Sequence, residues 1–135
     1  MNKYYFTFGT DLAFPYGLND FVEVAARTMR EAECAFREKH PDRASGTLNC
    51  AFVYSESEFD QIRNRYYGNR NPIESLTAEG LALSDTDKAI VAFELSGAKN
   101  VSEYLSTLGE EDRRLFANAV GLPEEYEDED TMEMA

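Results

Sequence analysis

Apolar and polar side chains alternate along three short stretches in the first half of this 135-residue chain. Such alternation, rich in aromatic and β-branched residues, is typical of strands. It predicts three strands, at residues 3–10, 21–25 and 49–54. In the first of them, Tyr4, Phe6 and Phe8 point to one face, and the residues between them point to the other.

The spacing of apolar residues changes to a helical period after the second strand. Met29, Ala32 and Phe36 recur on one side of this predicted helix. Thr28 is placed to cap it, with Glu31, on the solvent-facing side, as the capping-box partner. The following His-Pro pair is expected to end the helix, because a residue before proline avoids helical dihedral angles.

A second capping box opens a helix after the third strand. Ser55 and Glu58 have the Ser-x-x-Glu spacing, and Gly68 is placed to end the helix. The stripe expected to face the core consists of Phe59, Ile62 and Tyr66. Residues 1–70 therefore predict a ββαβα unit, in which a small antiparallel or mixed sheet is covered on one face by two helices.

The second half of the chain changes to a helical pattern. Ser84, Asn100 and the acidic residues from Glu110 are placed to begin three short helices. The last of these is expected to bury Leu115, Phe116 and Ala119. We therefore predict an α+β fold in three parts: a ββαβα core at residues 1–70, a helical extension packed on the same domain at residues 71–122, and an acidic, disordered tail at residues 123–135.

The charge of the chain is concentrated in its second half. The formal net charge is −13 at pH 7. Residues 1–70 carry nine Lys and Arg against ten Asp and Glu, whereas residues 71–135 carry four against sixteen. This asymmetry indicates an interaction surface or an acidic tail, and its field favours basic protein surfaces over nucleic acid or anionic lipid.

Cysteine content and hydropathy predict a reduced, cytoplasmic protein. The two cysteines, Cys34 and Cys50, fall inside predicted elements, the second on the same strand face as Phe52 and Tyr54. They form neither a disulfide framework nor a Cys-x-x-Cys metal pair. The N-terminal residues lack the apolar core of a signal peptide, and no apolar run is long enough to span a membrane.

No pattern of residues in the sequence predicts a reaction. His40 is the single histidine, and on the predicted helix it lies six residues after Cys34, on a different face. Phosphate-binding glycine motifs and the HExxH zinc signature are absent from the sequence. We therefore interpret the histidine and both thiols as structural, and expect a non-enzymatic protein with no cofactor and no metal.

Residues 63–70, the arginine segment, form a local basic stretch in which three arginines interleave with two tyrosines. Its candidate contacts to phosphates and bases are Arg63, Arg65, Tyr67 and Arg70. The segment could instead meet acidic helices of a second copy in a homodimer, or form the solvated end of a helix with Tyr66 in the core. The overall negative charge argues against direct nucleic-acid binding.

Acidic residues of the second half are the leading candidates for binding a partner. They are Glu103, Glu110, Glu111, Asp112, Glu124, Glu125, Glu127 and Asp128. Blocks of like charge are often only solvated tails. Alternatively, such carboxylates imitate the phosphates of a duplex and occupy a basic groove, which predicts salt-sensitive binding. Without the tail, residues 84–120 have a net charge of only −3, which weakens mimicry by the folded part.

Four stretches of the N-terminal half carry a resemblance to a known group of proteins. They read YYFTFG, FVEV, AFVYSESEF and YYG, at residues 4–9, 21–24, 51–59 and 66–68. In this pattern the chain resembles small uncharacterised proteins carried by phages and conjugative elements of gut-type bacteria. The resemblance covers residues 3–68 and implies no functional residues. The loop at residues 40–49 is longer than in that pattern, and the acidic helical C-terminus is an addition to it.

That resemblance implies a mobile-element accessory protein. Acidic members of this broad class often act as anti-defence inhibitors, including anti-CRISPR and anti-restriction proteins. The leading hypothesis is therefore a non-enzymatic protein that binds and inhibits a basic, nucleic-acid-targeting host protein. The alternatives are a nucleic-acid-binding accessory factor that uses the arginine segment, and a self-associating scaffold protein.

Overall fold

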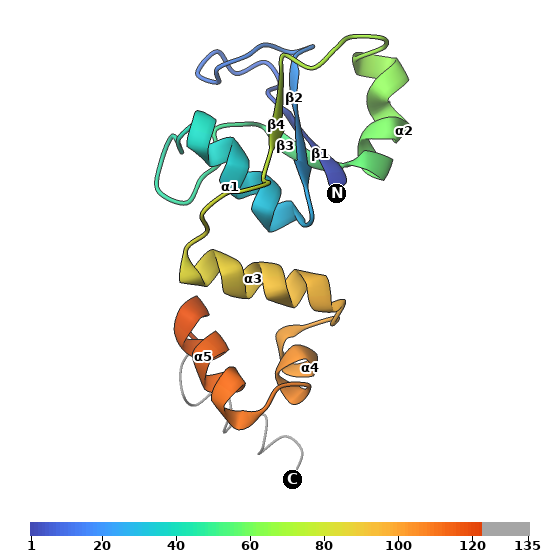
Figure 1. The fold of residues 1–135 in the computed structure, drawn as a ribbon. Coiled ribbons are helices and arrows are strands. Elements are labelled where there is room, and N and C mark those ends of the chain that lie inside the picture. Colours follow the sequence, from blue (N-terminus) through green and yellow to red (C-terminus); the bar gives the residue numbers. More distant parts are fainter. Residues whose placement is uncertain (123–135) are drawn as a thin grey trace. The chain divides into compact units, whose positions relative to one another are not determined.

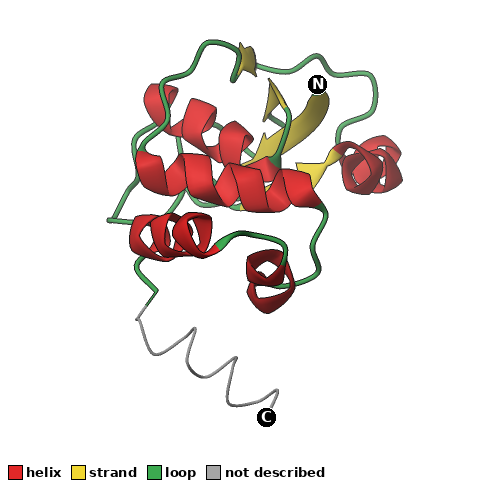
Figure 2. Cartoon of the chain, turned by 60° about the horizontal axis from the view of Figure 1, so that its bottom comes forward, coloured by secondary structure: helices red, strands yellow, loops and turns green. Residues whose placement is uncertain are grey.

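The structure is a computed structural model that describes residues 1–122. The chain divides into two compact units, an N-terminal unit of residues 1–82 and a helical unit that begins at Leu83. Strands and helices mix in the first unit, whereas the described part of the second contains helices alone (Figure 1, Figure 2). The predicted α+β class is confirmed.

A four-stranded sheet forms the centre of the N-terminal unit. Its strands lie in the order β3 (Phe52–Ser55), β1 (Asn2–Thr7), β2 (Phe21–Ala26) and β4 (Glu74–Thr77). β1 pairs antiparallel with β2 on one side and with β3 on the other, and β2 pairs parallel with β4. The sheet is therefore mixed, with β1 and β2 as its central strands.

Two helices cover opposite faces of this sheet (Figure 1). They are α1 (Met29–Lys39) and α2 (Glu56–Tyr66). On one face, Phe6 of β1 stacks on Phe36 of α1, with ring centroids 4.4 Å apart. On the other face, Tyr5 stacks on Phe59 of α2, with ring centroids 4.2 Å apart. The prediction that both helices cover one face is wrong, because the aromatic run of β1 supplies rings to both faces and each face needs its own cover.

Strand β4 has no signal in the sequence. Its four residues, Glu-Ser-Leu-Thr, contain one apolar side chain, so no alternation marks them. Backbone hydrogen bonds just outside its two ends hold it on β2. The Ile73 amide donates to the Phe21 carbonyl at 2.8 Å. The Ala78 amide donates to the Ala25 carbonyl at 2.9 Å. The predicted change to an all-helical chain at residue 71 is therefore wrong, and the sheet extends beyond the ββαβα core of residues 1–70.

The end of α2 differs from the predicted inner stripe at one residue. Tyr66, expected in the core, is 51% exposed, whereas Tyr67 is only 8% exposed. The helix ends at Tyr66, and Gly68 adopts a left-handed φ of +53° while its amide donates to the Arg63 carbonyl. This turn redirects the chain, so that the Tyr67 ring packs with its centroid 5.0 Å from that of Phe59.

The two predicted capping boxes have different outcomes. At α2 the box is complete, because the Ser55 hydroxyl accepts from the Glu58 amide and the Glu58 carboxylate accepts from the Ser55 amide. At α1, Thr28 caps the helix as predicted, but Glu31 accepts from the amide and the guanidinium of Arg27 instead. Glu31 is therefore buried rather than solvent-facing, and its hydrogen bonds with Arg27 lower the pKa of its carboxyl.

Strand β3 begins later than the third predicted strand. The chain bends at residues 49–51, and Cys50 packs against the core on the α1 face. Phe52 is exposed on this edge strand, while Tyr54 packs against the core on the α2 face. The prediction that all three side chains share a face is wrong for Cys50 alone, because the bend precedes the strand. Phe52 and Tyr54 lie on the same face of β3, with ring centroids 6.1 Å apart.

The helical unit contains α3 (Asp85–Ser96), α4 (Val101–Ser106) and α5 (Glu110–Val120). Side chains of Ser84 and Asn100 cap the first two helices, as predicted. The buried apolar residues of its described part are Val91, Leu105 and Phe116. Leu115, predicted to be buried, is 59% exposed. Adjacent residues on a helix point about 100° apart, and the buried stripe of α5 takes Phe116 rather than Leu115.

We expect Tyr67→Ala to lower the free energy of unfolding of the N-terminal unit by roughly 3 kcal/mol, because it removes a buried ring and leaves a cavity. The matched change Tyr66→Ala is expected to cost less than about 1 kcal/mol, because that ring is largely exposed. Urea unfolding of the full chain, followed by near-ultraviolet circular dichroism, measures both. Equal losses in the two variants would contradict this assignment of the tyrosines.

Candidate functional site

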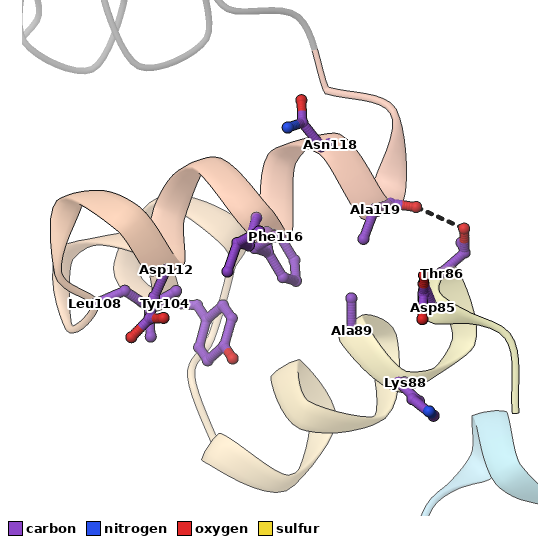
Figure 3. Close-up of a pocket in the computed structure, with 11 residues that line it drawn as sticks. Asp85, Thr86, Lys88, Ala89, Tyr104, Leu108, Asp112, Phe116, Asn118 and Ala119 are labelled. Carbon is purple, nitrogen blue, oxygen red and sulfur yellow. Dashed lines mark hydrogen bonds between the residues drawn. The ribbon is translucent and has the colours of Figure 1, made fainter.

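A groove of about 870 Å³ opens in the helical unit between α3, α4 and α5 (Figure 3). We call it the α3–α5 groove. Its apolar lining consists of Ala89, Tyr104, Leu108, Leu115, Phe116 and Ala119. Its polar lining consists of Asp85, Thr86, Lys88, Asp112 and Asn118. The groove therefore combines an apolar interior with charged groups.

Small side chains and one hydrogen bond shape this groove. Thr86 Oγ1 donates to the Ala119 carbonyl at 2.5 Å, which ties the start of α3 to the end of α5 (Figure 3). Ala89 of α3 points toward Phe116 and Ala119 of α5, and these alanines leave space between the helices (Figure 3). The Tyr104 ring meets the Phe116 ring edge-on, with centroids 5.1 Å apart. Aromatic rings and methyl groups thus form the apolar floor.

An acidic cluster, defined as Glu110, Glu111 and Asp112, occupies the first turn of α5. All three side chains are exposed, and the positive end of the helix dipole stabilises negative charge there. Asp112 also lines the α3–α5 groove, to which Asp85 contributes a second carboxylate. Arg114 lies 3.7 Å from Glu110, but both side chains are largely exposed, so this ion pair is weak. The structure thus places the predicted ordered cluster beside an apolar groove.

The other predicted acidic candidates have different positions. The Glu103 carboxylate accepts from the Lys99 amide at 2.7 Å, and the Glu103 amide donates to the Asn100 side chain at 2.8 Å. Glu103 therefore helps to cap α4. The remaining predicted candidates, which lie outside the described residues, are Glu124, Glu125, Glu127 and Asp128.

Two of the four predicted contacts in the arginine segment are used for packing. Tyr67 is buried, so its ring is not presented to a base. The Arg63 guanidinium lies over two aromatic rings of the core, 5.6 Å from the centroid of Phe21 and 5.4 Å from that of Phe59. Both side chains therefore pack against the aromatic core on the α2 face of the sheet.

The two exposed arginines among the predicted contacts each lie near a different neighbouring side chain. The Arg65 guanidinium lies 6.0 Å from the centroid of the exposed Tyr66 ring. Arg70 Nη1 lies 3.9 Å from Asp20 Oδ1. Arg65 and Arg70 are thus the predicted contacts that remain at the surface, and the second has a carboxylate beside it.

One polar contact that the sequence does not indicate joins α1 to β4. His40 Nε2 lies 2.5 Å from Glu74 Oε1, between residues 34 positions apart in the sequence. The Tyr16 ring lies edge-on to the His40 ring, with centroids 5.5 Å apart. Burial and the Glu74 carboxylate raise the pKa of Tyr16. Together, the three side chains join the loop after β1, the end of α1 and the start of β4. We therefore interpret their role as structural.

The Cys50 thiol lies in surroundings that suppress its reactivity. Burial raises the pKa of Cys50 to about 12, and the negative charge of Glu33 contributes to the increase. Because the thiolate is the nucleophilic form, this environment is the opposite of an activating one. Within residues 1–122, no group of three or more His, Cys, Asp or Glu side chains could hold a metal ion. None of the helices in the described part of the chain is long and apolar enough to cross a bilayer.

Sequence reasoning missed the groove because it assigned the apolar residues of the helical unit to a core. The one available signal was the Leu115–Phe116 pair, since an amphipathic helix buries one narrow stripe and leaves one of two neighbours off it. Comparison of the chain with protein-family models, curated proteins and solved structures found no match. The site is therefore interpreted from its own geometry and charge.

We expect Cys50 to be alkylated slowly in the folded protein. In the variant Cys34→Ser, which leaves Cys50 as the sole thiol, iodoacetamide at about pH 8 should react at least about a hundredfold more slowly than after unfolding in urea. The physical reason is that the raised pKa leaves few thiolates, so the rate should still be rising well above pH 9. Mass spectrometry of timed samples measures both rates. Comparable rates before and after unfolding would contradict the structural interpretation of this thiol.

Proposed function

We propose that this chain is a non-enzymatic, cytoplasmic protein of a mobile genetic element that binds and inhibits a basic, nucleic-acid-targeting protein of the host. The observation that carries the proposal is the exposed acidic cluster of α5, set beside the α3–α5 groove. A cluster in this position combines fixed negative charge with adjacent apolar surface, and both are available to a partner.

Electrostatics supports a basic partner. A protein that holds nucleic acid places Lys and Arg at its phosphate contacts. Exposed carboxylates are attracted to such a basic surface as phosphates are, and complementary charge speeds association. Residues 110–135 contain ten Asp and Glu against two Arg, three of the acids in the acidic cluster and seven after residue 123. When a partner binds the acidic cluster through its phosphate-binding surface, the cluster occupies part of that surface.

Direct nucleic-acid binding has weaker support. Tyr67 and Arg63, two of the four residues that such binding would use, are packed against the aromatic core. The net charge of −13 repels a phosphate backbone at the ionic strengths at which such binding normally occurs. The role as an inhibitor of host defence follows from the resemblance of residues 3–68 to phage and conjugative-element proteins.

We expect affinity capture from bacterial lysate, with the full chain as bait, to retain a basic nucleic-acid-handling protein at low salt and to release it at high salt. The variant Glu110→Gln, Glu111→Gln, Asp112→Asn should weaken binding to that purified partner by about tenfold or more, because it removes the ordered carboxylates. Duplex DNA should displace the chain from the partner. Mass spectrometry identifies the partner, and titration with the purified protein measures the affinity.

A matched variant separates local charge from total charge. Glu38→Gln, Glu56→Gln, Asp60→Asn removes the same three charges from exposed positions of the N-terminal unit, and should change the affinity by less than about threefold. Equal weakening by both triple variants would contradict a site on α5. Binding of labelled DNA by the chain itself, lost in Arg65→Glu, Arg70→Glu, would favour the nucleic-acid-binding alternative. Recovery of the chain alone would favour self-association.

A further inference from the structure

The helical unit leaves large apolar side chains at its surface while burying few. Three apolar residues in its described part are buried, namely Val91, Leu105 and Phe116. Leu115 is 59% exposed on the wall of the α3–α5 groove, and Leu95 is 51% exposed outside it. A unit of this size has little core of its own. Covering the groove would therefore add apolar burial that the unit alone does not achieve.

The groove has the size and composition of a side-chain binding site. Its volume of about 870 Å³ lies within the range of typical ligand pockets. Methyl groups and aromatic rings form the interior, and Ala89 of α3 points toward α5 near Ala119 (Figure 3). A helix laid along such a groove contributes residues at positions i, i+3 or i+4 and i+7 as apolar anchors.

The charge around the groove selects a cationic occupant. Asp85 and Asp112 line it, with Lys88 as the one cation of its lining, and Glu110 and Glu111 continue the negative charge from Asp112 along the first turn of α5. Residues 83–122 carry seven Asp and Glu against four Lys and Arg. The chain's own residues 123–135 contain seven acidic residues and no basic one, so their charge disfavours them as the occupant.

We infer that the α3–α5 groove receives the apolar face of a cationic amphipathic helix of the partner. The apolar side chains of that helix enter between Ala89, Leu115 and Phe116, and its Lys and Arg side chains meet Asp85, Asp112 and the rest of the acidic cluster. This inference rests on the proposed function, to which it adds the chemistry of the recognised segment. Carboxylates supply long-range attraction, and the groove supplies selectivity for an apolar stripe.

Two synthetic peptides test the inference against the full chain. Both consist of the same Leu, Lys and Ala residues, one ordered as an amphipathic helix and the other scrambled so that it has the same charge without an apolar stripe. Fluorescence anisotropy should show about tenfold tighter binding of the amphipathic peptide. Leu115→Gln should abolish this preference, whereas Leu95→Gln, an equally exposed leucine outside the groove, should retain it. Methyl NMR signals of Ala89 and Ala119 should shift with the amphipathic peptide.

The outcomes distinguish this inference from the proposed function. Equal, salt-sensitive affinity for both peptides would overturn the groove as a site and leave the acidic surface in place. A preference that survives Leu115→Gln would place the apolar contact elsewhere and also overturn it, as would failure of both peptides to bind. Glu110→Gln, Glu111→Gln should weaken both peptides by similar factors while keeping the preference. A dimer of the chain alone, dissociated by Leu115→Gln in light scattering, would assign the groove to a second copy and overturn the inference.

Discussion

The aromatic run of β1 is the constraint on which the N-terminal unit depends. Neighbouring residues Tyr5 and Phe6 point to opposite faces of the sheet, and each stacks on a ring from a different helix. Both faces must therefore be covered, and α1 and α2 cannot share one. Each aromatic pair adds about 0.5–1.5 kcal/mol beyond the burial of its area. The sheet is thus a shared layer between two aromatic cores.

This arrangement also determines which parts of the N-terminal unit remain available to a partner. Tyr67 and Arg63 close the core on the α2 face, which removes them from the surface that the arginine segment would otherwise present. Several charged side chains are likewise paired within the unit, as Arg27 is with Glu31 and Arg37 with Asp42. The aromatic and cationic groups of the arginine segment that remain exposed are Arg65, Tyr66 and Arg70.

The helical unit has the opposite character. Side chains cap α3 and α4, but the helices bury little, and Leu115 of the groove wall remains exposed near a cluster of carboxylates. An exposed apolar groove with a charged rim is a common feature of interaction sites. We therefore interpret the N-terminal unit as the stable scaffold of this chain and the helical unit as its binding surface.

Local chemistry alone determined much of this protein. Some features are set by residues within a few positions of one another, so the sequence determined them. They are the two-faced pattern of β1, the glycines that end helices, and the helix caps at Thr28, Ser55, Ser84 and Asn100. Other features depend on partners distant in the sequence. They are strand β4, the bend before β3, the burial of Tyr67 in place of Tyr66, and the contact of His40 with Glu74. β4 pairs because β2 offers it a free edge, and the groove exists because α3 and α5 bring Ala89 and Ala119 together. Those features were decided by tertiary structure, because burial and pairing are properties of surfaces that form only when distant segments meet.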